Sequence, residues 1–246
     1  MTLLLVAIMV GCSLIQGAAG FGFGIFAVPL LVWAGLELSN AVIVVAVTSL
    51  MQVAVGSITL RKHIKWREVF LASFFRVSAL PLGVYLLTSI DSLNEGVIKQ
   101  VLGGILLVIV AAQLLFRVQP RDHLHPLWRI FAFSMSGVMM GMVSMGGPPG
   151  VLWVMAQQWT NKETRAFLMS IFLFAVPVHL SLLYWAYGQT MLEPASQGLL
   201  FMPVVAVGSW LGIQLGNVLP KPRLRQIAFG LLLITAFSSL FAQWFG

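Results

Sequence analysis

Charged residues are scarce in this 246-residue chain: Asp, Glu, Lys and Arg make up only 9% of it, while hydrophobic residues make up 59%. A soluble domain carries roughly 25% charged residues because its surface must face water. This chain has too few polar groups to cover a globule, so lipid must be the solvent of most of its surface. The composition therefore excludes a soluble protein and predicts an all-α, multi-pass membrane protein embedded in a lipid bilayer.

The chain also lacks the residues that disulfides and metal sites require. Cys12 is the only cysteine, which excludes a disulfide within the chain, and no cluster of His and Cys has the spacing of metal ligands. We therefore expect no metal and no cofactor. The net charge of +7 would suggest nucleic acid in a soluble protein. Here the basic residues lie in short loops between apolar runs, where they determine membrane topology, so we expect no nucleic-acid partner.

The apolar runs differ in length, and an upright crossing of a bilayer takes about 20 residues. The runs 3–16, 23–36 and 148–159 are too short for that. We therefore expect 3–16 with 23–36, and 129–145 with 148–159, to form helical hairpins or broken helices. The other apolar runs are 40–60, 69–88, 97–116, 166–187, 197–216 and 226–244.

Glycine motifs recur along the chain at nearly constant separation. Glycine-rich segments at 17–24 and 141–150 interrupt apolar runs, and Leu-Gly pairs at Gly83 and Gly212 are spaced almost equally. Many secondary transporters build a mid-membrane binding site from a duplicated hydrophobic unit with a broken helix in each copy. Each unit is expected to contain one glycine-broken hairpin and about three spanning helices. The expected domains are a first transmembrane repeat at 1–118, a linker at 119–126 and a second repeat at 127–246.

The charges of the loops predict that the two units are inserted in opposite directions. Basic loops alternate along the chain with loops that are poor in Lys and Arg, and corresponding loops of the two halves have opposite bias. Because positive loops stay cytoplasmic, this pattern predicts inverted repeats. The basic loops are 61–67, 117–129, 162–165 and 221–225, and the loops poor in basic residues are 36–40, 89–96 and 188–194.

The glycine breaks have the chemistry of an anion site. Glycine lets a ligand approach the backbone closely, and Pro148 and Pro149 remove two amide donors and stop a helix. In hydrocarbon, freed backbone groups persist only inside protein or along a wet cavity, and amides at a helix N-terminus attract anions. Close helix packing is the alternative role for these glycines. The predicted substrate-binding residues are Gly20, Gly22, Gly24, Thr48, Ser49, Arg76, Ser144, Gly146, Gly147 and Gly150.

Two ionisable side chains fall inside apolar runs. Arg76 has no acidic residue in any apolar run to pair with, so an anionic ligand is a suitable partner, and snorkelling to the cytoplasmic surface is the alternative. His179 can change charge near neutral pH; it would either carry a coupling proton or hydrogen-bond a neighbouring helix. The lack of embedded Asp and Glu argues against a carboxylate-based cation relay, but Na⁺ coupling through backbone carbonyls stays open.

The motifs resemble those of a known family. The first glycine-rich break, followed by Val28-Pro29-Leu30-Leu31, is similar to the first signature of the TauE/SafE family of sulfite and organosulfur-anion exporters. The segment 141–150 is similar to its second signature, although Phe23 and the Pro148-Pro149 pair depart from the usual pattern. The resemblance spans nearly the whole chain. It implies a secondary transporter that exports a small inorganic or organic sulfur anion across the bacterial inner membrane by alternating access.

Two other functions are compatible with parts of the sequence. An ion-coupled uptake carrier for another small solute would have the same architecture, because the pattern does not set the direction of transport. Ser144 and His179 could instead form the dyad of an intramembrane serine protease. Against that, Met142 and Met145 depart from a Gly-x-Ser-Gly pattern, and a duplication has no role in that chemistry. We therefore expect a transporter rather than an enzyme, and leave its oligomeric state open.

Overall fold

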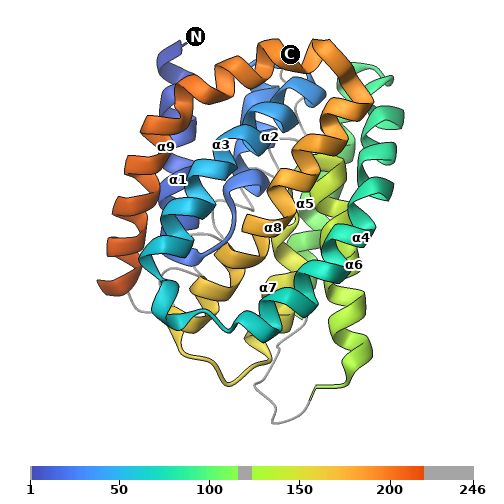
Figure 1. The fold of residues 1–246 in the computed structure, drawn as a ribbon. Helices are drawn as coiled ribbons and strands as arrows, with labels where there is room; N and C mark the ends of the chain where they lie inside the picture. Colours follow the sequence, from blue (N-terminus) through green and yellow to red (C-terminus); the bar gives the residue numbers. More distant parts are fainter. Residues whose placement is uncertain (1, 116–123, 219–246) are drawn as a thin grey trace.

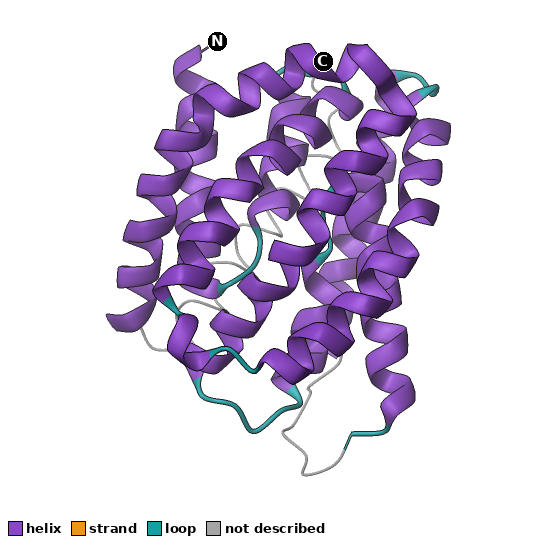
Figure 2. Ribbon diagram, in the orientation of Figure 1, coloured by secondary structure: helices purple, strands orange, loops and turns teal. Residues whose placement is uncertain are grey.

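The structure is a computed structural model that describes residues 2–115 and 124–218 (Figure 1). These residues are helical and include no strand (Figure 2), so the predicted all-α class is confirmed. The basic loop 221–225, the run 226–244 and most of the linker 119–126 lie outside the described residues. The helices are α1 (Thr2–Ala19), α2 (Phe23–Trp33), α3 (Leu38–Thr59), α4 (Trp66–Asp91), α5 (Glu95–Leu115), α6 (Pro126–Val143), α7 (Gly147–Met155), α8 (Asn161–Tyr187) and α9 (Leu192–Val218), with short 3₁₀ turns η1 (Arg61–His63) and η2 (Gly188–Met191).

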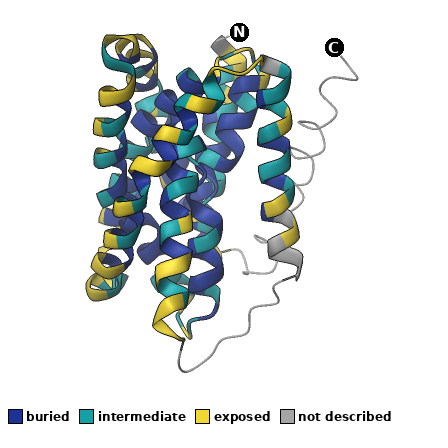
Figure 3. Ribbon diagram, turned by 90° about the vertical axis from the view of Figure 1, so that its right-hand side faces the viewer, coloured by how far each residue is buried: buried dark blue, intermediate teal, exposed yellow. Residues whose placement is uncertain are grey.

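Several of these helices are suited to a bilayer. By length and composition, four segments of the described chain could cross a membrane: Leu38–Thr59, Trp66–Asp91, Pro126–Val143 and Asn161–Val218, the last containing both α8 and α9. Large apolar side chains such as Phe74, Tyr85, Trp185 and Leu200 are exposed on the outside of the bundle, whereas buried residues concentrate within it (Figure 3). Apolar exposure of this kind is stable in lipid, so the chain is a membrane protein.

Both glycine-rich segments interrupt the helices where the sequence predicts. The first break, residues 20–22, separates α1 from α2, and Gly20 and Gly22 have φ of 87° and 114°, which side chains with a Cβ rarely adopt. The second break, residues 144–146, separates α6 from α7, and Ser144 has φ of 55°. Two prolines stand in the first turn of α7, where the missing amides would have no helical partner in any case. Each break therefore turns a short helix back into the bundle.

The two broken hairpins enter the bundle from opposite ends (Figure 1). The chain starts at the top of the view and α1 runs downward, whereas α6 starts at the bottom and runs upward. The basic segments 61–67 and 162–165 and the start of α6 lie at the bottom, which we call the basic end. The connections from α2 to α3, α4 to α5 and α8 to α9 lie at the top, which we call the opposite end. The described loops thus separate by charge as the alternation along the chain predicts.

Polar contacts tie the halves together at both ends. At the basic end, Lys65 Nζ lies 2.8 Å from a carboxylate oxygen of Glu163, and Arg129 Nη2 lies 2.6 Å from one of Glu68. At the opposite end, Asp91 accepts hydrogen bonds from the Ser39 amide (3.1 Å) and from the hydroxyl of Tyr187 (3.3 Å). Polar contacts therefore join the first half of the chain to the second half at both ends of the bundle.

Glycines set how closely the main helix pairs approach. Gly17 of α1 packs against Gly212 of α9, and Gly83 of α4 packs against Gly141 of α6. At Gly17 and Gly83, an added Cβ would overlap a backbone carbonyl oxygen of the partner helix. Small residues that let backbones approach are the usual means of packing helices in lipid, where the hydrophobic effect does not drive association.

Gly83→Ala should destabilise the protein because the new methyl group has to displace backbone rather than a flexible side chain. Overpacking of this kind typically costs about 1–3 kcal/mol. We expect a lower thermal unfolding midpoint of the purified protein in detergent. Gly104→Ala is the matched control, because an added Cβ at Gly104 of α5 meets nothing within 4 Å, and alanine favours a helix over glycine. Equal midpoints for the two variants would contradict the close packing of α4 on α6.

Candidate functional site

The two breaks meet inside the bundle. A methyl group added at Gly24, in the first turn of α2, would overlap the carbonyl oxygen of Ser144 in the second break. A Cβ at Gly147 would lie 3.4 Å from Cβ of Phe21 in the first break and 3.6 Å from Cδ1 of Ile25. Because Gly24 has no side chain, the backbones of two segments far apart in sequence come into contact here.

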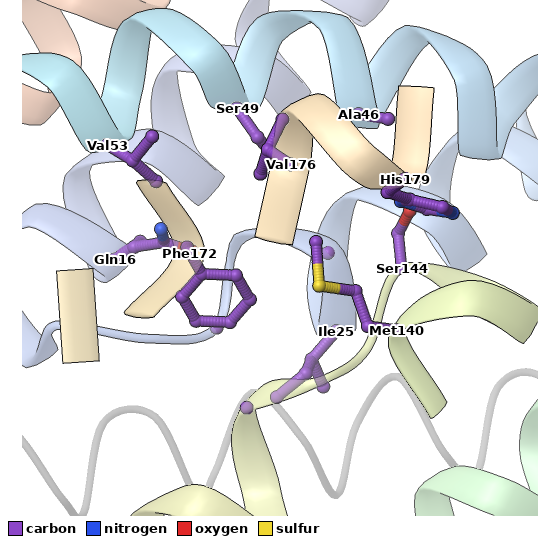
Figure 4. A pocket seen from close by; sticks show the side chains of 13 residues that line it. Gln16, Ile25, Ala46, Ser49, Val53, Met140, Ser144, Phe172, Val176 and His179 are labelled. Carbon is purple, nitrogen blue, oxygen red and sulfur yellow. The ribbon is translucent and has the colours of Figure 1, made fainter. Parts of the chain in front are cut away.

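A small cavity lies beside this contact (Figure 4). Its volume is about 20 Å³, which is room for about one water molecule. Both halves contribute to its wall. The lining residues are Gln16, Gly22, Gly24, Ile25, Ala46, Ser49, Val53, Met140, Ser144, Gly147, Phe172, Val176 and His179.

The polar side chains of the cavity are neutral or become charged only on protonation. Ser144 and His179 are drawn at one side of the cavity and Gln16 at the other (Figure 4). The Ser144 hydroxyl has no hydrogen-bond partner among the described residues. His179 is completely buried, and its ring lies beside the backbone of Gly141 in α6, which is a hydrogen-bond partner for it. The Ser49 hydroxyl donates to the carbonyl of Val45 (2.6 Å). These groups are free, or can be freed, to bind a small polar ligand.

Gln16 is a lining residue that the sequence analysis did not include among the site residues. It is only 4% exposed, and its Oε1 accepts a hydrogen bond from the Phe23 amide (2.8 Å), so it spans the first break. The signal was present in the sequence as a polar residue one position before a glycine-rich break. On its own, a glutamine near a helix end is equally compatible with a contact between helices.

The structure divides the predicted site residues into two groups. Gly22, Gly24, Ser49, Ser144, Gly147 and His179 line the cavity. Gly20, Thr48, Arg76, Gly146 and Gly150 do not. Within the second group, the hydroxyl of Thr48 donates to the carbonyls of Val44 (2.8 Å) and Val45 (3.1 Å) of its own helix. Gly20 packs against Arg165, and Gly150 packs against Phe133 and Arg76.

Arg76 lies behind the second break rather than at the membrane surface. It is completely buried, which rules out snorkelling in this conformation. Its Nη2 donates to the carbonyl oxygen of Gly146 (2.8 Å) and to the hydroxyl of Ser136. The guanidinium also lies over the ring of Phe172, 4.4 Å from its centroid, an attractive arrangement for a cation. Since Phe172 lines the cavity, one aromatic ring separates this charge from it.

Backbone amides add donors at the cavity. The first amides of a helix have no hydrogen-bond partner within the helix. In α2, the amide of Phe23 donates to Gln16, and the amides of Gly24 and Ile25 are the next two at this end of the helix. The prolines of α7 leave Gly147 as the donor nearest the second break. Among the described residues no group of His, Cys, Asp and Glu could hold a metal ion. The arrangement therefore offers neutral donors and partial positive charge, which suits an anion.

The Ser–His dyad of the alternative serine-protease function is not formed. Ser144 and His179 line the same cavity, but the Ser144 hydroxyl makes no hydrogen bond to either ring nitrogen. A nucleophilic serine needs that bond to pass its proton to the base. The proximity of the two residues thus reflects a shared cavity wall.

Comparisons with known proteins identify the family of this chain. The model of a family described as Sulfite exporter TauE/SafE matches residues 3–239. A protein of Cupriavidus necator named "Probable sulfite/organosulfonate exporter TauE" is 26% identical over 223 residues, which cover 89% of this chain and 85% of that protein. No solved structure matches the chain significantly. The family is one of transporters and not of enzymes. From residue 3 to residue 239, this chain therefore belongs to the TauE/SafE sulfite exporter family.

Proposed function

We propose that the protein is a secondary transporter that exports sulfite or an organosulfonate across the bacterial inner membrane by alternating access. The observation that carries this proposal is the contact of two helix breaks beside a buried polar cavity, with Gly24 against Ser144. The name of the Cupriavidus necator relative supports a sulfur anion as substrate. Both the oxygens of sulfite and those of a sulfonate are strong acceptors for amides and hydroxyls.

Inverted repeats at 1–118 and 127–246, joined by a linker at 119–126, account for the packing of the helices. The motifs that correspond in the two halves contact each other crosswise: Gly17 meets Gly212, and Gly83 meets Gly141. Reciprocal contacts of this kind are the mark of a two-fold relation between units. The entry of α1 and α6 from opposite ends of the bundle also supports the inverted arrangement (Figure 1).

The anion would be held mainly by the groups that line the cavity. Amides near Gly22, Gly24 and Gly147 and the hydroxyls of Ser49 and Ser144 would donate to its oxygens. The other predicted residues would act without touching the anion. Gly20, Gly146 and Gly150 would shape the breaks, and Thr48 would stabilise the helix that carries Ser49. Arg76 would attract the anion by its charge across Phe172 and Gly146.

Alternating access explains why the cavity is so small. Sulfite is larger than the water molecule that about 20 Å³ can hold, so loading requires the halves to separate on one side. The pairs of Lys65 with Glu163 and Arg129 with Glu68 close the basic end, and the contacts of Asp91 close the opposite end. Opening one end at a time would expose the cavity to one side of the membrane. His179 would carry the coupling proton, with Na⁺ as the alternative coupling ion.

The purified protein should move sulfite in proteoliposomes. We expect saturable flux of sulfite and of sulfoacetate or thiosulfate, no flux of chloride, and a change in rate when a pH gradient is imposed. The measurement is uptake into liposomes with and without the gradient, with empty liposomes as control. If none of these anions moves, the proposed function is wrong. Flux that depends on a Na⁺ gradient and runs only inward would favour the uptake carrier.

Variants of the cavity wall should separate binding from coupling. Ser144→Ala removes one neutral hydrogen bond, which is worth about 0.5–1.5 kcal/mol, so we expect the KM for sulfite to rise about two- to tenfold. His179→Gln keeps hydrogen-bonding capacity but cannot be protonated; we expect flux to persist while its dependence on the pH gradient disappears. Ser181→Ala is the matched control, because Ser181 is exposed on the same helix as His179. An unchanged pH dependence in His179→Gln would exclude His179 as the proton carrier.

Arg76→Gln should raise the KM for sulfite because it removes the positive charge behind Phe172. One buried charge near a helix terminus is worth up to about 2 kcal/mol, so a rise of about tenfold is expected. The same flux assay gives the measurement, and the thermal midpoint in detergent reports whether the fold persists. Wild-type kinetics in this variant would show that Arg76 has no part in attracting the anion.

A further inference from the structure

A second buried arginine, Arg165, lies at the first break. It is the fifth residue of α8, and although the sequence places it in a basic loop, its side chain is only 1% exposed. Its Nη2 donates to the carbonyl oxygens of Gly17 (2.7 Å) and Ile213 (2.9 Å), and its Nη1 donates to Oδ1 of Asn217 (3.1 Å). One guanidinium therefore binds α1 and α9 at the point where these helices touch.

The position of Arg165 is well fixed. Thr160 and Glu163 form a reciprocal capping box that starts α8, and Glu163 also pairs with Lys65. Gly20 has no side chain, and a Cβ there would lie 3.1 Å from the Cα of Arg165 and 3.2 Å from its Cγ. The glycine thus provides the room through which the arginine reaches the end of α1.

Arg165 has no acidic partner among the described residues, since no carboxylate there lies within ion-pair distance of it. Carbonyl oxygens and one amide compensate its charge instead. One of these, Gly17 O, belongs to the last turn of α1, which ends at Ala19, and the last carbonyls of a helix carry partial negative charge. The guanidinium is therefore placed to neutralise the negative end of α1.

This neutralisation matters because of how a broken helix acts on an ion. The negative C-terminus of one half-helix lies beside the positive N-terminus of the next, so their effects on a nearby charge partly cancel. In such breaks, N-termini attract anionic groups and C-termini coordinate cations. When the negative end of α1 is neutralised, the electric field in the cavity comes mainly from the positive N-terminus of α2, which carries the amides of Gly24 and Ile25.

We propose that Arg165 is an electrostatic positioning residue that makes the first break selective for anions over cations. The inference rests on the proposed function and assigns this residue to the same site. Gly17 directly follows Gln16 in sequence, and Gln16 and Gly24 line the cavity on either side of the break. The hydroxyl of Ser144 in the wall of the same cavity is buried and has no hydrogen-bond partner among the described residues, which indicates independently that a polar ligand is accommodated there. Arg165 does not touch that ligand; it acts through the end of α1.

The sharpest test is Asn217→Asp. The new carboxylate keeps an acceptor for Arg165 Nη1 and forms an ion pair with it, so the local structure is retained or strengthened, while the positive charge is neutralised. We expect the KM for sulfite in proteoliposomes to rise about three- to tenfold, with a similar maximal rate and an equal or higher thermal midpoint. A purely structural role predicts no increase in KM.

Two further variants separate charge from hydrogen bonding. Arg165→Lys keeps the charge and should keep the KM within about twofold, whereas Arg165→Gln loses the charge and should raise it about tenfold. Lys62→Gln is the matched control, because it changes the net charge by the same amount at the same end of the bundle, at an exposed residue of η1. Its KM should equal that of the wild type.

Each outcome decides between the alternatives. A wild-type KM in Asn217→Asp overturns the inference while sulfite flux by the wild type leaves the proposed function intact. An equal rise in Arg165→Lys and Arg165→Gln also overturns it, because hydrogen-bond geometry rather than charge would then be responsible. If the wild type moves none of the sulfur anions, the proposed function fails first and no anion site remains for Arg165 to serve.

Discussion

The need to satisfy backbone polar groups inside a membrane governs this fold. A helix that stops in hydrocarbon exposes amides and carbonyls that lipid cannot hydrogen-bond, so a break is stable only where protein surrounds it. Here the two breaks meet where Gly24 contacts Ser144. Gln16 binds the Phe23 amide, Arg76 the Gly146 carbonyl and Arg165 the Gly17 carbonyl. Helix packing, the cavity and the buried charges all follow from enclosing these two breaks.

Glycine makes the enclosure possible in two different ways. At the breaks it permits positive φ and backbone contact, and between the long helices it lets Gly17 meet Gly212 and Gly83 meet Gly141. Both roles depend on the missing Cβ, but only the glycines at the breaks line the cavity. Of the two interpretations of the glycine motifs that the sequence leaves open, close packing is seen between the long helices, and ligand approach at the breaks remains part of the proposed function.

Two buried arginines place positive charge at the helix breaks. Arg76 and Arg165 lie each at one break, bind carbonyl oxygens there and have no carboxylate partner among the described residues. An arginine that is paired with a carboxylate has little effect on a distant ion, because the two opposite charges cancel. An arginine that binds only carbonyl oxygens keeps its net positive charge. Under the proposed function, these two charges would attract an anion to the cavity although no charged side chain lines it.

The sequence by itself determined the membrane class, both helix breaks, their order and the separation of basic from non-basic loops, because these follow from hydropathy, glycine and proline chemistry and charge counted along the chain. It also indicated Gly22, Gly24, Ser49, Ser144, Gly147 and His179, which line the cavity. Only the tertiary structure decided that Thr48 turns its hydroxyl to its own helix, that Gln16 spans the first break and that Arg165 is buried. The physical reason is that these roles depend on which helices come together in space: a basic residue in a loop and one that caps a neighbouring helix look identical until the neighbour is known.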